Sequence, residues 1–334
     1  MSGIDFTVYK GSSSGKVVKS KTHKEVLQPD EVLIKITHAG LCGTDLHYKT
    51  QDMVLSHEGV GVVEKIGSEV KNFKVGERAG WGYLHNACLH CDQCLSGNEI
   101  FCPKRALYGI ADFDQGAFAS HAIWREAFLF HIPDAISSAA AAPLMCAGAT
   151  VFNALELHGV RPTDRVGVIG IGGLGHLAIQ FAAKMGCNVV VFSGTDSKSD
   201  EAKALGAHEF YATKGAKNLD IGRPVNYLIV TTSANPDWNL YLPVIAPRAI
   251  IAPLTISEGD FKFPHNPLVV KGIRIQGGIC PSRGLHVKML RFAALHGITP
   301  VIQEFPLTLE GIEEAIDKLE KGKIRYRGVL VAQA

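Results

Sequence analysis

The stretch Arg165-Val-Gly-Val-Ile-Gly-Ile-Gly-Gly-Leu-Gly-His176 decides the fold of this chain. An apolar run precedes the pattern G-x-G-x-x-G, and a helix-forming stretch follows it as far as Met185, before Gly186. In that context the three glycines allow a tight turn, close approach of a pyrophosphate, and close helix–strand packing, and the helix start offers N–H groups to phosphates. We therefore predict a strand–turn–helix unit whose dinucleotide-binding residues are Gly170, Gly172, Gly173, Leu174 and Gly175.

Strand-like and helix-like stretches alternate after this turn. They are 189–192, 197–205, 226–230, 237–244, 249–254 and 272–279. Such alternation favours βαβ units and a parallel sheet. The first 130 residues are instead rich in predicted strands, for example Glu31–Thr37 and Gly59–Ile66. We predict a mostly β first domain at 1–148 and an α/β domain at 149–284, while residues 285–334, with an amphipathic helix from Leu309, fit either domain by pattern alone.

The composition excludes several classes of protein. The 334 residues carry a formal net charge of +2, with 46% hydrophobic and 20% charged residues, an ordinary globular balance. Without basic runs we expect no nucleic-acid partner. Two uncharged stretches, 135–155 and 166–183, contain Pro143 and several glycines, so we interpret them as buried core, with no membrane association. The N-terminus shows no secretory signal, and we expect a cytoplasmic protein.

Four of the eight cysteines lie close together, with the spacing C-x2-C-x2-C-x7-C. In a chain without a secretory signal, such a set indicates metal binding or catalysis more than disulfides. Four thiolates close a tetrahedron and leave no position for water, so the site is predicted to be structural. Zinc is the favoured ion, with an iron–sulfur cluster as the lesser alternative, and His85 and His90 are interpreted as ordinary loop residues. The predicted ligands are Cys88, Cys91, Cys94 and Cys102.

A second set of metal-binding residue types is dispersed along the chain. Cys42, His57 and Cys146 supply the ligands typical of a catalytic zinc with one open position. Zinc in an open site acts as a Lewis acid toward a carbonyl or an alkoxide. Glu58 is an additional, occasional ligand, and Asp45 is expected to hydrogen-bond the second ring nitrogen of His57. Taken singly, each residue fits an ordinary core or loop position equally well.

The choice of dinucleotide depends on the end of the strand at 189–192. An NAD site usually has an Asp or Glu there to hold the ribose 2′-hydroxyl, whereas this chain has Ser193. Ser193 and Thr195 can donate hydrogen bonds to a 2′-phosphate, and Lys198 adds positive charge. We therefore predict NADP(H), with NAD as the alternative if Asp196 points into the pocket.

In this order, the motifs resemble those of the zinc-dependent medium-chain alcohol dehydrogenases, and within them the cinnamyl-alcohol-dehydrogenase-like NADP-dependent aldehyde reductases. The resemblance spans nearly the whole chain, and the motifs that carry it are Gly40–His47, His57–Gly59, the four cysteines, Cys146–Thr150, Arg165–His176 and Ser193–Lys198. It implies an α/β fold in which a Rossmann-type doubly wound parallel sheet domain accompanies a mostly β, GroES-like catalytic domain, to which residues 285–334 return. It also implies a homodimer.

The resemblance assigns roles residue by residue. It implies two zinc ions per chain, one catalytic at Cys42, His57 and Cys146 and one structural at the four clustered cysteines. Thr44 and His47 match the proton relay, which runs through the cofactor ribose. The remaining matches are Thr150 beside the nicotinamide, Arg327 on a cofactor phosphate, and Tyr83 as an aromatic residue of the substrate pocket.

Two features depart from the family pattern. The segment between Cys42 and His57 is shorter than in relatives, so the loop at 48–56 must be clipped and the substrate mouth reshaped. Ser56 also replaces the glycine that usually precedes the His-Glu pair. Both departures leave the ligands in place, so they bear on the substrate more than on the metal.

The expected function is reversible interconversion of aldehydes and primary alcohols by hydride transfer with NADP(H), on a small-molecule substrate. Alternatives on the same fold are a polyol dehydrogenase, against which Cys146 argues, and a reductase of conjugated or iminium double bonds, against which the intact relay and metal set argue. A more distant alternative is a cofactor-binding protein without catalysis.

Overall fold

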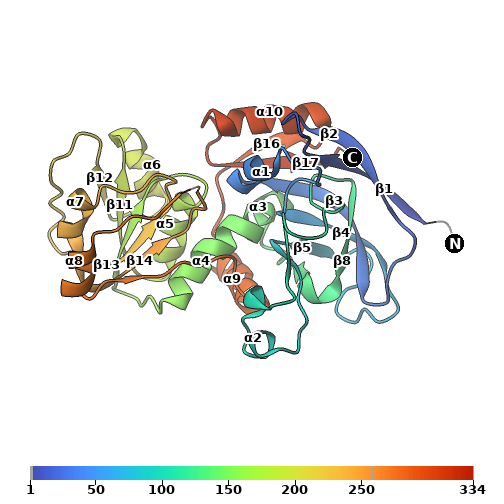
Figure 1. The fold of residues 1–334 in the computed structure, drawn as a ribbon, viewed down its shortest axis with the longest axis horizontal. Helices are drawn as coiled ribbons and strands as arrows, with labels where there is room; N and C mark the ends of the chain where they lie inside the picture. The colour runs from blue at the N-terminus through green and yellow to red at the C-terminus, as the bar shows by residue number, and fades with distance from the viewer. Residues whose placement is uncertain (1–2, 258, 334) are drawn as a thin grey trace. The chain divides into compact units, whose positions relative to one another are not determined.

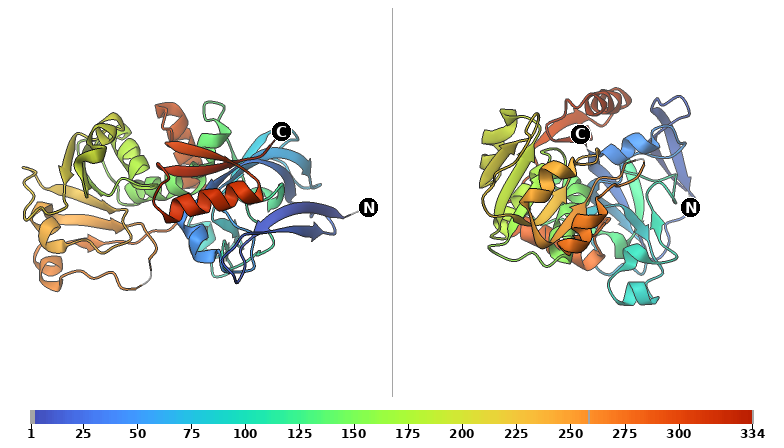
Figure 2. Two further views of the ribbon diagram at one scale, coloured as in Figure 1. Left: turned by 90° about the horizontal axis from the view of Figure 1, so that it is seen from above. Right: turned by 60° about the vertical axis from the view of Figure 1, so that its left-hand side comes forward.

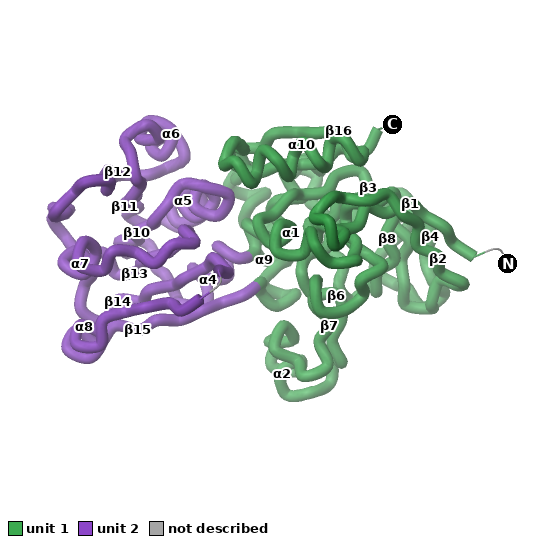
Figure 3. The backbone as a smooth tube through the Cα atoms, turned by 45° about the horizontal axis from the view of Figure 1, so that its top comes forward, with its two compact units in different colours: residues 1–149, 280–334 green, residues 150–279 purple. Residues whose placement is uncertain are grey.

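The computed structural model describes residues 3–257 and 259–333. The chain divides into two compact units (Figure 3): unit 1 comprises residues 1–149 and 280–334, and unit 2 comprises residues 150–279. The sequence predicts divisions at 148/149 and 284/285.

Unit 2 is built on a six-stranded sheet in which neighbouring strands run parallel (Figure 1). The strand order is β12-β11-β10-β13-β14-β15, so the order reverses between β10 and β13. This is the doubly wound arrangement, and it confirms the predicted Rossmann-type sheet. The strands are β10 (Arg165–Ile169), β11 (Asn188–Ser193), β12 (Glu209–Ala212), β13 (Val225–Val230), β14 (Ile245–Pro253) and β15 (Arg274–Ile275).

Helices surround this sheet because its central strands are apolar on both faces. Val190, Leu228 and Ile251 are fully buried and pack with Trp238 and Tyr241 in one core cluster. The helical segments are α4 (Ala149–Leu157), α5 (Gly175–Lys184), the 3-10 turn η4 (Asp196–Lys198), α6 (Ser199–Ala204), α7 (Trp238–Tyr241), the 3-10 turn η5 (Leu242–Val244) and α8 (His265–Val270).

Unit 1 is centred on a mixed sheet of order β16-β17-β3-β4-β5-β9, with β8 also paired to β3. These strands are β3 (Glu31–Leu41), β4 (Gly59–Ile66), β5 (Arg78–Trp81), β8 (His121–Arg125), β9 (Phe130–His131), β16 (Ile302–Pro306) and β17 (Arg327–Val331). Two smaller pairs stand apart from it: β1 (Ile4–Lys10) with β2 (Val18–Lys24), and β6 (Leu84–Asn86) with β7 (Ala106–Leu107). This sheet agrees with the predicted GroES-like domain.

The C-terminal segment belongs to unit 1 because β17 pairs antiparallel with β3. Helix α10 packs beside β16 and β17 (Figure 2). The helical segments of unit 1 are α1 (Gly43–Tyr48), α2 (Asp92–Leu95), the 3-10 turns η1 (Glu99–Phe101) and η2 (Glu126–Phe128), α3 (Ser138–Pro143), the π-turn η3 (Leu144–Gly148), α9 (Arg283–His296) and α10 (Leu309–Glu320).

Some predicted elements differ from the structure. The expected strand at 272–279 is only β15, and the expected segment at 237–244 is split into α7 and η5, with Pro243 inside the second piece. Neither the β1–β2 hairpin nor α9 was predicted. One helical stretch, Ser138–Leu157, has the length and hydropathy of a membrane span. However, 72% of its most apolar 18-residue segment is buried within the structure, as in a core helix.

Candidate functional site

The segment 88–102, here named the cysteine lobe, brings its four thiols together around α2 and η1. All four sulfur atoms lie within 4.8 Å of one another. Neighbouring sulfurs are 3.5 to 3.9 Å apart. A tetrahedral site with zinc–sulfur bonds of about 2.3 Å has sulfur–sulfur edges of about 3.8 Å, so the lobe fits a zinc ion without rearrangement.

The two histidines near the lobe differ in environment. His90 is exposed, and its backbone N–H hydrogen-bonds the Cys88 sulfur, which lowers the pKa of Cys88 to about 6. His85 is instead buried beside Trp124, with Nδ1 3.3 Å from Asp112 Oδ2. The interpretation of His85 as a loop residue is therefore wrong, because it lies in β6 and is buried, and burial lowers its pKa.

A second group of donors, here named the dispersed cluster, is assembled from three separate segments. Cys42 follows β3 and precedes α1, the pair His57–Glu58 precedes β4, and Cys146 lies in η3. One donor atom from each of the four residues lies within 4.8 Å of the others. The two sulfurs are 3.9 Å apart, again the spacing that a shared zinc ion requires.

Buried atoms of the dispersed cluster that lack a hydrogen-bond partner also fit a metal ion. Both ring nitrogens of His57 are buried, and among the described residues neither has a hydrogen-bond partner. Oε2 of Glu58 is likewise buried and unpaired. Buried polar atoms without partners are costly, so a ligand at this point satisfies them. Two thiols with an imidazole are a donor set that prefers zinc.

Charges within the dispersed cluster are strongly coupled. Burial alone would lower the pKa of His57, but Asp45 and the Cys42 thiolate outweigh it and raise the pKa to about 10. A hydrogen bond from Cys146 lowers the pKa of Cys42. Burial raises the pKa of Glu58 to about 7, against the opposing charge of Arg327. Metal binding to His57 must therefore displace a proton.

Asp45 lies at the centre of the hydrogen bonds that support this cluster. Its carboxylate accepts from Cys42 N at 2.8 Å, from Ser56 N at 3.0 Å and from the Tyr108 hydroxyl at 2.8 Å. The predicted hydrogen bond to His57 is a longer ion-pair contact here, with 3.8 Å between Asp45 Oδ1 and His57 Nδ1. The role of Tyr108 was not predicted, because nothing in the sequence connects it with Asp45.

Arg327 lies in β17 and is 6% exposed. Its guanidinium pairs with the Glu58 carboxylate. The strand that the C-terminal segment contributes to the sheet therefore brings a positive charge to the dispersed cluster. Its contact with a cofactor phosphate stays a prediction.

The predicted relay residues and pocket aromatic lie on elements adjacent to the cluster. Thr44 and His47 both belong to α1, where residues three apart share one side of a helix. Thr44 Oγ1 is 3.5 Å from Cys42 Sγ, and His47 is exposed. The Tyr83 ring meets the His57 ring edge-on, with 5.2 Å between ring centres. Burial raises the pKa of Tyr83, so its hydroxyl stays protonated.

The loop at 48–56, which the resemblance predicts to be clipped, is anchored rather than open. Met53, Val54 and Leu55 are buried, and Lys10 pairs with Asp52 at 3.1 Å. The backbone N–H of Leu55 donates a hydrogen bond to Tyr9 O. The loop is thus fastened to the β1–β2 hairpin. At its end, Ser56 has φ of 68°, a left-handed conformation that glycine adopts most easily.

In unit 2, the three glycines of the turn between β10 and α5 meet different surroundings. Gly170 has φ of 93°, as the tight turn requires. A Cβ on Gly175 would lie 2.0 Å from Gly170 O, so only glycine allows the helix to approach the strand there. A Cβ on Gly172 would meet nothing within 4 Å, so this face is open to a ligand. Gly173 and Leu174 complete the turn before α5.

The predicted 2′-phosphate residues follow β11. Ser193 ends that strand, Thr195 Oγ1 is 2.8 Å from Ser197 Oγ, and Asp196 is exposed. Lys198 Nζ donates to Ile171 O at 2.8 Å, so this ammonium group reaches back to the glycine-rich turn. Thr150 is the second residue of α4 and is half-buried.

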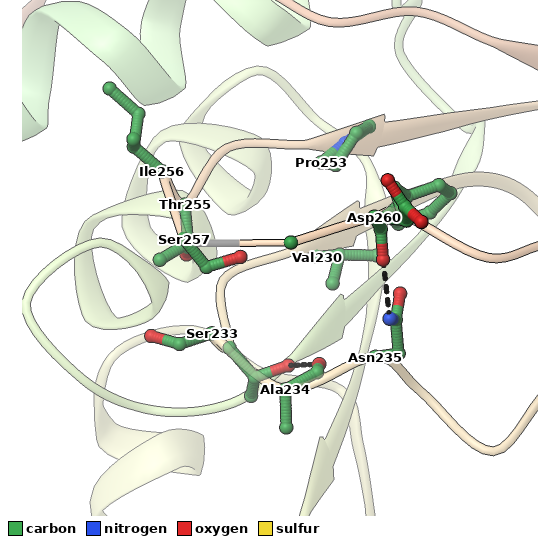
Figure 4. Close-up of a pocket in the computed structure, with 12 residues that line it drawn as sticks. Val230, Ser233, Ala234, Asn235, Pro253, Thr255, Ile256, Ser257 and Asp260 are labelled. Carbon is green, nitrogen blue, oxygen red and sulfur yellow. Dashed lines mark hydrogen bonds between the residues drawn. The ribbon is translucent and has the colours of Figure 1, made fainter.

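A pocket of about 240 Å³ opens at the carboxyl ends of β13 and β14 (Figure 4). Its lining includes Val230, Thr232, Pro253 and Ser257, and Asn235 Nδ2 donates to Asp260 O at 2.8 Å across one side. Ligands of doubly wound sheets bind beyond the carboxyl ends of the strands. The sequence did not reveal this pocket, because its residues follow no motif and meet only when β13 and β14 pair.

Two family models match the chain. The alcohol dehydrogenase GroES-like domain matches residues 28–134, and the zinc-binding dehydrogenase domain matches residues 173–295. The matched ranges contain the cysteine lobe and the segments of the dispersed cluster up to Glu58, while Cys146 and Arg165–Gly172 lie between them.

Individual relatives cover nearly the whole chain. Cinnamyl alcohol dehydrogenase 8 of Arabidopsis thaliana is 33% identical over 326 residues, covering 93% of this chain and 90% of the relative. NADP-dependent alcohol dehydrogenase C 1 of Mycolicibacterium smegmatis is 31% identical and covers 96% and 95%. The crystal structure of CAD from Helicobacter pylori complexed with NADP(H) is 25% identical, covers 98% of both chains and superposes with a TM-score of 0.89.

Proposed function

The chain belongs to the zinc-dependent medium-chain alcohol dehydrogenases, in the cinnamyl-alcohol-dehydrogenase-like branch, and from this premise we propose which of its residues perform the reaction. The activity of this branch is NADP(H)-dependent interconversion of aldehydes and primary alcohols. The observation that carries the assignment is the convergence of Cys42, His57 and Cys146 from three separate segments into one donor set.

The two donor sets would hold two zinc ions. The cysteine lobe provides four thiolates and leaves no room for a fifth ligand, so its ion is structural. The dispersed cluster provides Cys42, His57 and Cys146, with Glu58 as an occasional fourth donor held back by Arg327. When bound, zinc at the dispersed cluster supplies Lewis-acid polarisation of a carbonyl oxygen, and NADPH supplies the hydride.

The protein's own contribution to proton transfer comes from α1. The Thr44 hydroxyl, close to Cys42, donates a hydrogen bond to the substrate oxygen and so orients it. His47, exposed one turn later, passes the proton between this site and solvent. Tyr83, whose ring edge meets His57, forms one wall of the substrate site with its hydroxyl protonated.

The cofactor site is assigned to unit 2. The glycine-rich turn would hold the pyrophosphate, with its open face at Gly172. Ser193, Thr195 and Lys198 would bind the 2′-phosphate of NADP, where an acidic residue would repel it. The pocket beyond β13 and β14 would receive the nicotinamide end. By the family resemblance, Thr150 is a further candidate contact of the nicotinamide, and Arg327 of a cofactor phosphate.

We further propose a cytoplasmic homodimer. All eight cysteines are unpaired thiols, as expected in a reducing compartment. Strand β15 ends the six-stranded sheet and has one neighbour, while Val269 and Val270 of the adjacent α8 are 64% and 75% exposed. An unpaired strand edge with exposed valines suits pairing with a second copy. Val270→Lys should convert the dimer to monomer in light scattering, and a monomeric wild type would refute the proposal.

A cofactor-depletion screen tests the proposed function. Zinc-loaded protein is mixed with aromatic and aliphatic aldehydes, and loss of NADPH is followed with NADH in parallel. Aldehyde-dependent oxidation of NADPH, at least about tenfold faster than that of NADH, supports the assignment of Ser193, Thr195 and Lys198. The variant Lys198→Ala, assayed in the same way, should lose this preference for NADPH over NADH. Equal rates with the two cofactors would contradict the 2′-phosphate assignment.

A further inference from the structure

We infer that Ser56 is a positioning residue for the dispersed cluster. It fastens the segment that carries Cys42 to the turn that carries His57 and Glu58, so that the donors of both segments converge on one point. The inference rests on the proposed ligand set, and it concerns a residue outside that set.

The conformation of Ser56 shows that its place in the chain is not an ordinary one for serine. The residue is fully buried, and its φ of 68° lies in the left-handed region. A non-glycine residue in this region is strained, and the strain persists only where the surrounding structure fixes it. If the turn needed only the backbone conformation, glycine would form it with less strain.

The hydroxyl of Ser56 makes bonds that glycine cannot make. Oγ donates to Gly40 O at 2.7 Å, two residues before Cys42. The same oxygen accepts from Glu58 N at 3.3 Å, so one side chain joins the end of β3 to the ligand-bearing turn. A Cβ on Gly40 would lie 1.9 Å from the Glu58 carboxylate, which shows how closely the two segments approach.

The backbone of Ser56 completes the connection. Its N–H donates to Asp45 Oδ1 at 3.0 Å, and the other carboxylate oxygen of Asp45 accepts from Cys42 N at 2.8 Å. The carbonyl of Ser56 accepts from Ala117 N at 2.7 Å. Every polar group of the residue is therefore bonded, and three of these bonds, those to Gly40, Asp45 and Glu58, lead to segments bearing ligands. Residues that orient metal ligands in this way typically change metal affinity or activity by about 10- to 100-fold when altered.

Two substitutions separate positioning from simple turn formation. Ser56→Gly removes the hydroxyl and also relieves the left-handed strain. Ser56→Ala removes the hydroxyl and keeps the strain, so it is expected to melt at a lower temperature than Ser56→Gly. If the hydroxyl positions the ligands, both variants must hold zinc less well. If Ser56 only forms the turn, the glycine variant must match the wild type.

The experiment measures zinc release from full-length protein into a chromophoric chelator, with the cysteine lobe as the internal control. We expect two zinc ions per wild-type chain. Release of one of them should be about 10- to 100-fold faster in Ser56→Gly and Ser56→Ala, with the slow, four-thiolate ion unchanged. Cobalt(II) substituted at the faster site should show a shifted visible band in both variants, a change that loss of folding stability alone would not produce.

The outcomes are distinguishable. A glycine variant that releases zinc within about threefold of the wild-type rate, with an unshifted cobalt band, overturns the inference while leaving the proposed ligand set intact. A wild-type chain that binds only the lobe ion overturns the ligand set itself, and the inference with it. Should Ser56→Ala fail to fold, Ser56→Gly alone decides the question, because it carries no added strain.

Discussion

The two donor sets of unit 1 have similar geometry, but one comes from a single local segment and the other from three separate segments. In each, the donor atoms lie within 4.8 Å of one another. The cysteine lobe is one local segment whose ligands are a few residues apart. The dispersed cluster takes Cys42 from the end of β3, His57 from the turn before β4, and Cys146 from η3 far along the chain. A local site is specified by spacing, whereas a dispersed one requires the whole sheet to form first.

The two sets also differ in their surroundings. The lobe sulfurs have backbone partners, such as Lys104 N on Cys102, and its edge is anchored by Glu99, which binds Arg283 at the start of α9. In the dispersed cluster, His57 and Glu58 are buried with Asp45 and Arg327, so the charge of each group shifts the pKa of its neighbours. The cysteine lobe is therefore suited to stabilising the fold, whereas the dispersed cluster holds donor groups whose protonation can change.

The largest effect is expected for Cys42→Ser. Loss of one thiolate from the dispersed cluster should lower aldehyde reduction by about 10³-fold or more, since it removes the charge stabilisation of the reacting oxygen. NADPH binding, measured by fluorescence titration, should persist because unit 2 is unchanged. Cys187→Ser, the same chemical change at a buried thiol of unit 2, is the matched control. Full activity without the Cys42 thiolate would refute the zinc assignment.

Cys94→Ser should act on stability instead of chemistry. The buried lobe thiol is part of the closed set, and losing its zinc should cost several kcal/mol, which lowers the melting temperature by about 10 °C or more. Zinc analysis should find the ion of the dispersed cluster still bound. If Cys94→Ser instead lost activity and kept its melting temperature, the cysteine lobe would be the catalytic site and not the structural one.

Acid should weaken the helix that anchors the lobe. His286 of α9 is buried against the Phe130 ring, and burial lowers its pKa to about 3. The unfolded chain takes up a proton near pH 6.5 and the folded chain does not, so this contribution to stability is complete above pH 6.5 and falls as the pH drops. Roughly 2 kcal/mol should be lost by pH 5.

The measurement is the free energy of unfolding by urea at pH 7 and pH 5. His286→Leu should show a smaller loss between the two pH values than the wild type. The same substitution at the exposed His265 should leave the loss as it was. A loss of equal size in His286→Leu would show that the acid sensitivity arises elsewhere.

The smallest effect is expected for His47→Ala. Because His47 is exposed, water can replace it in proton exchange, so turnover should slow by only about tenfold. Imidazole added to the buffer should restore part of the rate, because a dissolved proton carrier can take the place of the exposed side chain. A variant that turns over at the wild-type rate would remove His47 from the relay.

The same contrast explains what the sequence could predict. The lobe ligands, the glycine-rich turn and the parallel sheet are local patterns, and the structure has them where the motifs lie. The bonds that hold the dispersed cluster are not local. Tyr108 reaches Asp45, and Arg327 reaches Glu58, only because β17 pairs with β3 and the loop before β8 folds over the sheet. The spacing of residues along the sequence does not indicate such contacts.

The left-handed turn at Ser56 could not be predicted from the residue itself. A serine gives no sequence signal for positive φ, whereas a glycine at this position would have given one. The pocket beyond β13 and β14 was invisible for a related reason, since its lining comes from two loops without a motif.

The account depends most on a zinc ion at the dispersed cluster, and anomalous diffraction at the zinc absorption edge tests it directly. Crystals of the full chain should show two peaks per molecule. One should lie in the cysteine lobe, and the other about 2.0 to 2.3 Å from the Cys42 and Cys146 sulfurs and a ring nitrogen of His57. A single peak, confined to the lobe in protein grown with excess zinc, would contradict the account.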